Sequence, residues 1–295
     1  MFDLRYHVVS LAAVFLALVI GILVGVGLTS QGVLSTTEAK VKDQQISDLQ
    51  RTLNSTRQQV TDLRRAKRVA DDYVKGTYPA LMLHRLAKTR VAVLFAGSVD
   101  GGVRSEIGET LADASSLGPA RLGSLRLPVD VQKVNRVLRE RSFSRYVGQP
   151  GRLGSALADE FVLGGKMPLW SSLTRQLTST QDGAEQDSVD AVVVVRSAAP
   201  QMRGSARFLS GLYNELVALR VPVVGVEESD SALSCVGTFK KHGLSSVDDL
   251  DTTAGRLALA VVLAGGQAGH YGIKPAADDL LPPVEPVRTT ARTGA

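Results

Sequence analysis

The sequence has few of the side chains that bind soft metals or form disulfides. It contains one cysteine, Cys235, together with four histidines and four methionines. A single cysteine cannot form a disulfide within the chain, and its apolar neighbours predict a buried core residue. The histidines show neither HxH nor HxxxH spacing, the methionines are scattered, and no CxxC is present. Copper and zinc sites are commonly built from such clusters, so the residues alone predict no metal site.

The motifs of common enzymes are missing as well. The first strand-to-helix turn, Gly97–Gly102, reads GSVDGG, which is neither a dinucleotide-binding GxGxxG nor a Walker loop. No GxSxG nucleophile elbow is present. Asp100, Glu227 and Asp230 are expected near the strand ends, but acidic loop residues are usually just solvated. We therefore expect a protein that is not an enzyme and has no resident cofactor, with nucleotide binding and catalysis at these strand ends as weaker alternatives.

Positive charge is concentrated in one segment. The formal net charge is +5, and residues 38–90 hold 12 Lys/Arg against 6 Asp/Glu, whereas residues 91–295 hold 21 against 22. A basic segment close to a bilayer attracts anionic head groups, so membrane lipid is an expected partner. Aromatic residues make up only 5% of the chain, and no Gly/Arg pattern accompanies the charge. No nucleic-acid partner is therefore expected.

One long apolar segment lies near the N-terminus. Val8–Leu28 has 21 residues and no charge. At about 1.5 Å per residue, such a helix crosses the roughly 30 Å hydrocarbon core of a bilayer. The apolar run is longer than that of a cleaved signal peptide, and no A-x-A follows it. Residues 1–29 are therefore predicted to form a transmembrane signal anchor that is retained.

The charges beside this segment predict its orientation. Arg5 precedes it, and the run from Thr29 to Thr37 carries no charge. Positive charge favours the cytoplasmic side of a membrane helix. We expect a single-pass protein of the cell membrane with a cytoplasmic N-terminus and an extracytoplasmic bulk.

Small residues recur at every fourth position of the same segment. This helix-dimer stripe consists of Ala13, Ala17, Gly21 and Gly25. Small residues allow two helix backbones to approach closely in lipid. Alanine and glycine are common in membrane helices in any case, but four in register ahead of a coiled coil favour a parallel homodimer.

A heptad pattern follows in residues 30–78, the predicted coiled-coil stalk. Apolar residues occupy seven of the nine a and d positions that begin at Ile46, and Thr56 and Lys67 occupy the other two. The apolar members of this seam are Ile46, Leu49, Leu53, Val60, Leu63, Ala70 and Val74. A single helix of this kind is marginal in water, so the seam needs a partner. That partner could be a second copy, the chain's own α/β domain or a coiled coil of another protein.

The end of the stalk helix is also predicted by composition. Residues 38–75 contain neither glycine nor proline, and Gly76 and Pro79 come next. These two residues are predicted to stop the helix before the globular domain begins.

Buried strands alternate with helices in residues 79–281. The three clearest strands are apolar runs at Arg90–Gly97, Asp190–Arg196 and Val221–Glu227. A fourth strand is expected at 120–127, and helices at 103–116, 129–141, 205–219 and 252–263. Residues 151–170 are also predicted to be helical, with a break at Gly164, Gly165 and Pro168. This alternation predicts an α/β fold with a doubly wound, mostly parallel sheet, Rossmann-like or flavodoxin-like. Ligands of such folds bind beyond the carboxyl ends of the strands. The Pro- and Thr-rich residues 282–295 are predicted to be a disordered tail.

Two segments resemble a known family. Leu4–Leu18, with the sequence LRYHVVSLAAVFLAL, is similar to the N-terminus of the actinobacterial MctB family, named for mycobacterial copper transport. Ser246–Asp251, Gly255–Arg256 and Gly269–Gly272 resemble that family's C-terminal signature. The order of apolar helix, coiled coil and α/β domain fits the family too, so the resemblance spans most of the chain.

The resemblance implies a role in copper homeostasis at the cell envelope, described as channel-like transport. It also implies a competing role, because similar proteins of the SteB type are tied to cell separation, to control of septal peptidoglycan hydrolases and to a neighbouring membrane protein. No copper-binding or catalytic motif is carried over, so copper is an expected ligand through the resemblance alone.

The residues and the family name point in different directions. The strands of an outer-membrane pore alternate apolar and polar residues over about ten positions, whereas the three clearest strands here are short and uniformly apolar. The membrane segment offers Ser10 as its only polar side chain before Thr29, which makes a poor path for an ion. Two hypotheses follow: an envelope protein of copper homeostasis, and a dimeric scaffold that docks a peptidoglycan hydrolase or membrane partner through its coiled coil.

Overall fold

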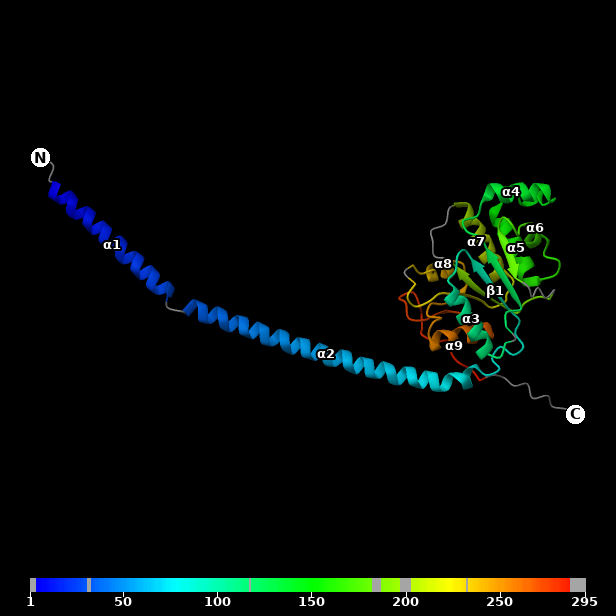
Figure 1. Cartoon of the computed structure of the whole chain (residues 1–295), viewed down its shortest axis with the longest axis horizontal. Helices are drawn as coiled ribbons and strands as arrows, with labels where there is room; N and C mark the ends of the chain where they lie inside the picture. The colour runs from blue at the N-terminus through cyan, green and yellow to red at the C-terminus, as the bar shows by residue number, and fades with distance from the viewer. Residues whose placement is uncertain are drawn as a thin grey trace. The chain divides into compact units, whose positions relative to one another are not determined.

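The structure is a computed structural model of the chain, and it describes residues 4–30, 33–116, 118–181, 187–196, 203–231 and 233–286. Two compact units are present, Met1–Ala70 and Asp71–Ala295. Figure 1 shows the helices of the first unit in blue and the α/β domain of the second in cyan to red.

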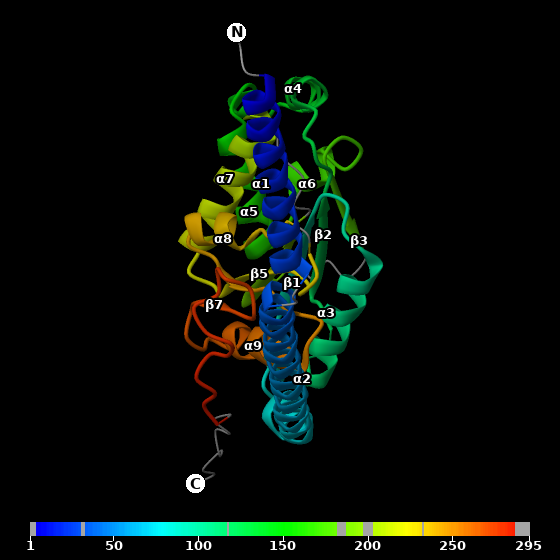
Figure 2. The same ribbon diagram turned by 90° about the vertical axis from the view of Figure 1, so that its left-hand side faces the viewer.

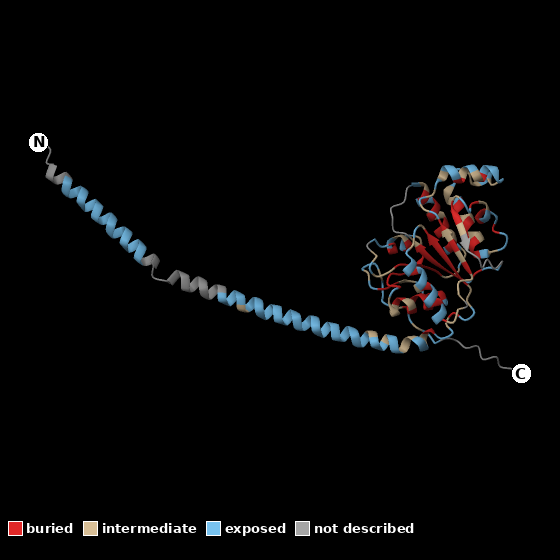
Figure 3. Ribbon diagram, in the orientation of Figure 1, coloured by how far each residue is buried: buried red, intermediate tan, exposed pale blue. Residues whose placement is uncertain are grey.

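The first unit is helical throughout its described residues. Helix α1 spans Leu4–Ser30. Its residues from Val8 to Leu28 carry no charge, and a helix is the conformation in which such a segment bonds its own backbone groups in lipid. Its residues Val8–Gly27 form the one described helix that is long and apolar enough to cross a membrane. None of that span is buried against other parts of the chain, as the pale blue in Figure 3 shows.

Helix α2 spans Val33–Met82 and continues through Gly76 and Pro79. The prediction that these two residues end the helix is therefore wrong. Proline removes one backbone hydrogen bond, but the last turn gains contacts with the domain. The Tyr78 hydroxyl donates to the Asp113 carboxylate at 2.9 Å, and the Met82 side chain is fully buried. Burial of one such side chain contributes about 1.5–3 kcal/mol, which together with the Tyr78 bond is of the same order as the roughly 3 kcal/mol that a proline costs inside a helix.

The second unit is built on one sheet of seven strands in the order β3-β2-β1-β4-β5-β6-β7. All neighbouring strands run parallel except β2 and β3, which are antiparallel. The strands are β1 (Val91–Ala96), β2 (Arg121–Leu125), β3 (Thr178–Gln181), β4 (Ala191–Arg196), β5 (Val223–Val226), β6 (Ser245–Val247) and β7 (His270–Tyr271). β1 and β4 are buried along almost their whole length, as expected for strands covered on both faces.

Helices cover both faces of the sheet. One face packs against α4 (Val131–Glu140), α5 (Pro150–Leu163), α6 (Pro168–Ser172), α7 (Arg203–Ala218) and α8 (Val236–Lys241). The other packs against α3 (Gly101–Asp113), α9 (Thr253–Leu263) and the end of α2. A single-turn 3-10 helix, Ser144–Tyr146, precedes α5. α5 and α7 lie side by side in both views of the ribbon (Figures 1 and 2).

The mixed α/β class and the mostly parallel sheet are confirmed. The sequence prediction missed the short elements β3, β6, β7 and α8. It also placed a disordered tail from residue 282 onward. The first part of that tail packs on the domain, since Pro282 is buried and Val284 lies against the core around α3 and α9. The remainder, residues 287–295, falls outside the described residues.

Candidate functional site

Glu227, which was predicted to lie at the ligand-binding edge, is held in a buried ion pair. The ammonium of Lys274 donates to Glu227 Oε1 at 2.7 Å, and the Ser234 hydroxyl donates to the same oxygen at 2.6 Å. The backbone N–H of Cys235 donates to Oε2 at 2.6 Å. Both carboxylate oxygens are thus occupied, and the Glu227 side chain joins the end of β5 to the segment after β7.

Asp100 and Asp230 lie at the same edge in more open positions. Asp100 caps α3, because its carboxylate accepts the N–H of Gly102 at 2.9 Å. Asp230 is exposed. The three predicted acidic residues therefore do not share one role: Asp100 caps a helix, Glu227 holds an ion pair, and Asp230 faces solvent.

The structure adds two acidic residues, Glu106 and Asp251, that the sequence reasoning did not place at this edge. Burial raises the pKa of Glu228, and the charges of Glu106, Asp230, Asp100 and Asp251 raise it further. Glu228 directly follows Glu227 at a strand end, so the sequence itself places it here. The resulting acidic edge attracts cations in general. Among the described residues, however, no three His, Cys, Asp or Glu side chains are grouped as metal ligands.

The residues of the C-terminal signature join the end of β6 to the segment after β7 through hydrogen bonds. Asp248 is fully buried and accepts the N–H groups of Ile273 at 2.8 Å and Lys274 at 3.3 Å. Gly272 sits against this carboxylate with a φ of +133°, and a Cβ there would lie 2.1 Å from Asp248 Oδ1. Only glycine fits this position, so Gly272 in the Gly-His-Tyr-Gly segment is explained by packing.

Asp249 is the second buried acid of the signature. Its Oδ2 accepts the Thr252 hydroxyl at 2.9 Å, while its buried Oδ1 has no hydrogen-bond partner among the described residues. Burial raises the pKa of Asp249 to about 6, with the charges of Asp248 and Asp251 adding to the effect. Thr252 in turn caps α9 through the N–H of Gly255 at 2.9 Å.

The side chains able to bind a soft metal are scattered, and several already have protein partners. His270 Nδ1 lies 2.9 Å from the Ser246 hydroxyl, and His242 Nδ1 lies 2.9 Å from Asn214 Oδ1. Cys235 is buried, and burial raises the pKa of its thiol. A thiol kept protonated is a weak metal ligand.

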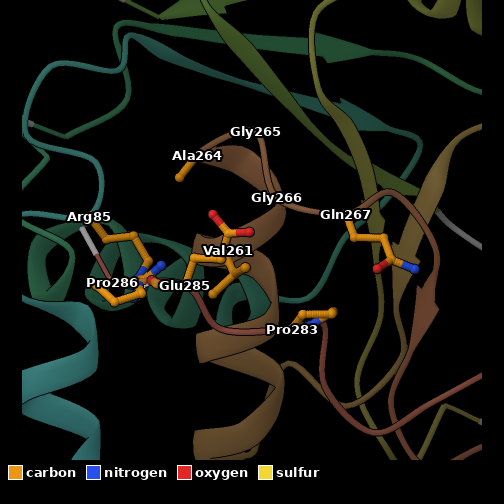
Figure 4. Close-up of a pocket in the computed structure, with 9 residues that line it drawn as sticks. All are labelled: Arg85, Val261, Ala264, Gly265, Gly266, Gln267, Pro283, Glu285 and Pro286. Carbon is orange, nitrogen blue, oxygen red and sulfur yellow. Dashed lines mark hydrogen bonds between the residues drawn. The ribbon is translucent and has the colours of Figure 1, made fainter. Parts of the chain in front are cut away.

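A cavity in the domain lies at the opposite, amino edge of the sheet, beside the end of α2. It has a volume of ≈ 510 Å³ (Figure 4). Three separate segments line it: Arg85 after α2, the C-terminal turn of α9, and the chain from Pro283 to Pro286. A smaller cavity of ≈ 250 Å³ shares Gly265 and Gly266 with it.

The C-terminal end of α9 lines this cavity and has a common helix-end geometry. Gly265 has a φ of +85°, and Gly265 N–H and Gly266 N–H donate at 3.0 Å to the carbonyls of Val262 and Val261. These two bonds make a Schellman motif, which requires a left-handed residue at the helix end.

Arg85 connects the walls of the same cavity. Its Nε donates to the Leu81 carbonyl at 2.7 Å, and its Nη2 donates to the Glu285 carbonyl at 3.2 Å. Burial lowers the pKa of Arg85. The guanidinium therefore fastens the segment at residues 283–286 to the end of α2.

The residues predicted to mediate dimerisation are uncovered in the single chain. The helix-dimer stripe Ala13, Ala17, Gly21 and Gly25 is exposed. So are most seam residues, among which Leu49 is 68% exposed and Leu63 69% exposed. Val74, the last seam residue, is half-buried. The structure contains one chain, so these positions remain predictions.

Comparison with known proteins gives one family. The family model described as "Copper transport outer membrane protein, MctB" matches residues 1–282. Proteins named "Copper transporter MctB" from Mycobacterium bovis and Mycobacterium tuberculosis are 27% identical over an alignment of 330 positions. The alignment covers 92% of this chain and 96% of each relative.

Proposed function

The chain belongs to the MctB family, and on this premise we propose that it is a membrane-anchored protein of the cell envelope that takes part in copper homeostasis. The observation that carries the proposal is the match over residues 1–282, which includes the apolar helix and almost the whole α/β domain. The relatives named as copper transporters are similar over nearly their full length, which supports the same process for this chain.

The proposed topology is a single-pass anchor. Its support is the span Val8–Gly27, which has the length and composition of a membrane helix. With Arg5 before this span and no charge in the nine residues after Leu28, we place the N-terminus in the cytoplasm and the α/β domain outside.

The proposed assembly is a parallel homodimer. The stripe of Ala13, Ala17, Gly21 and Gly25 would pair two copies of α1 in the membrane. The exposed seam residues would pair two copies of α2 as a coiled coil.

The α/β domain is proposed to be a non-enzymatic, Rossmann-like module. The order of strands β3 to β6, in which the chain adds strands first on one side of β1 and then, from β4 onward, on the other, supports the comparison. The antiparallel β3 departs from it.

The copper role is proposed to be indirect. A dimer of α1 presents alanine, glycine and aliphatic side chains, with little to replace the hydration shell of an ion. Copper moved by such a protein would therefore cross through another component, which this chain would hold or regulate from outside the membrane.

Cellular copper tests this proposal. In cells that lack the protein, we expect cell-associated copper, measured by mass spectrometry, to change when external copper is raised. The full chain should restore the wild-type level. A chain with residues 1–29 replaced by a cleaved signal peptide should not, because it is released from the membrane. Unchanged copper in the deleted strain would refute the copper role.

A second candidate is a scaffold that docks a peptidoglycan hydrolase or another membrane protein. The exposed apolar seam on α2 favours it, because such a surface needs a partner in water. Capture of a defined hydrolase by the full chain, lost on Leu53→Asp with Leu63→Asp, would support it. Capture that survives both changes would place the docking site elsewhere and remove the seam as its basis.

A further inference from the structure

The amino-edge cavity has the size of a small-molecule site. Its volume of ≈ 510 Å³ falls within the range of about 300–1,000 Å³ that is usual for ligand pockets. Its walls combine aliphatic surface from Val261, Ala264 and two prolines with the polar groups of Arg85, Gln267 and Glu285. Figure 4 shows Arg85 on one side of the cavity, Gln267 on the other, and the Glu285 carboxylate between them.

Two opposite charges line this cavity without neutralising each other. Arg85 meets Glu285 only through the backbone carbonyl, at 3.2 Å. Within the described part of the chain, the Arg85 guanidinium forms no ion pair with a carboxylate, and the Glu285 carboxylate forms none with a cation. A partly buried guanidinium bound only to carbonyls keeps its full charge, which favours an anionic group beside it.

The surroundings of Glu285 favour a positively charged group. In Figure 4 its carboxylate points toward the last turn of α9. The C-terminal end of a helix carries partial negative charge, and a carboxylate near it is unfavourable unless a cation lies between them. The carbonyl end of α9 and the Glu285 carboxylate together form a position suited to an ammonium group.

We propose that this cavity binds a small zwitterion of the amino-acid or short-peptide class. The carboxylate of the ligand would pair with Arg85, its ammonium would lie between Glu285 and the end of α9, and the aliphatic walls would contact its side chains. The proposal does not depend on copper, and it places a ligand at the amino edge of the sheet, where the stalk helix joins the domain.

Alanine and its peptides of two to four residues are suitable probes, because they hold the two charges at different separations. We expect at least one of them to bind to the full chain in detergent, as measured by calorimetry. Its N-acetylated form, which lacks the ammonium, and its C-amidated form, which lacks the carboxylate, should each bind at least about tenfold more weakly.

Substitutions of Glu285 and Arg85 test which residue binds the ammonium of the ligand and which binds its carboxylate. Glu285→Gln should weaken the free peptide about tenfold and leave the acetylated form unchanged, while Arg85→Gln should leave the amidated form unchanged. Lys166→Gln removes an exposed charge elsewhere and should alter nothing. If Arg85→Gln unfolds the domain, Ala264→Leu, which narrows the cavity from an exposed position, should abolish binding instead.

Three outcomes would overturn the proposal. If the acetylated form binds as tightly as the free peptide, the cavity is a site for anions only. If the amidated form binds as tightly as the free peptide, the cavity is a site for cations only. Absence of binding by all four probes at about 10 mM would mean that the cavity takes no ligand of this class.

Discussion

The stalk helix and the α/β domain place the same kinds of side chain in opposite surroundings. Val194 in β4 is fully buried, whereas Leu49 and Leu63 on α2 are 68% and 69% exposed. Glu227 and Lys274 form a buried ion pair, whereas Arg51 and Asp48 pair on the exposed face of α2. The core of the domain is buried within the chain, while the apolar seam of the first unit is exposed. Matched substitutions in the two regions test whether the domain and the stalk differ in this way.

The largest difference is expected from one charge placed in each region. Val194→Asp puts a carboxylate between β1 and β5 with no partner, which costs more than about 4 kcal/mol and should prevent the domain from folding. Leu49→Asp should leave thermal unfolding of the domain unchanged and shift the full chain from dimer to monomer in light scattering. A loss of domain stability with Leu49→Asp would show that the stalk is not independent of the domain.

The second prediction compares ion pairs. Lys274→Met leaves the Glu227 carboxylate buried and uncompensated, with an expected loss of about 3–5 kcal/mol in the free energy of unfolding. Asp48→Asn removes an exposed pair and should cost less than about 0.5 kcal/mol. Thermal unfolding in detergent measures both. Equal effects would contradict the buried structural role of Glu227 and leave its carboxylate available to bind a ligand.

The same contrast explains how far the sequence could predict the structure. β1, β4 and β5 are uniformly apolar, so their pattern alone identifies them. β6 and β7 are only three and two residues long and contain serine and histidine, so no periodicity marks them. α2 was predicted to end at a glycine and a proline, but burial of Met82 by a distant part of the chain overrides that local preference.

The site was predicted less well than the fold, because its geometry depends on distant residues. Acidic side chains at the strand ends were anticipated. That Lys274 would neutralise Glu227 was not, since the two lie 47 residues apart in the sequence. The amino-edge cavity combines segments near residues 85, 265 and 285, and no motif in any of them indicates that they meet.

Asp249 should make the stability of the domain depend on pH. Asp249 has a pKa of about 6 in the folded domain and about 3.9 when unfolded. Between these values the folded state retains a proton that the unfolded state has lost, so stability falls as pH rises from about 4 to about 6. The side chain of the Asp249→Asn variant is neutral at every pH. The free energy of unfolding of this variant, compared with that of wild type, should therefore rise by up to about 2 kcal/mol between pH 4 and pH 7. A constant difference across this range would mean that Asp249 does not titrate in it.

The smallest expected effect lies where α2 joins the domain. The Tyr78 hydroxyl donates to Asp113 at 2.9 Å, and burial together with that carboxylate raises the pKa of Tyr78, so the phenol remains a donor. Tyr78→Phe should cost about 1 kcal/mol, visible as a small drop in the unfolding temperature of the full chain. Tyr73→Phe is the matched control, because Tyr73 is 72% exposed on the same helix and should change nothing. Equal effects of the two changes would show that the Tyr78–Asp113 bond does not hold the last turn of α2 on the domain. Burial of Met82 alone would then determine where α2 begins to pack on the domain.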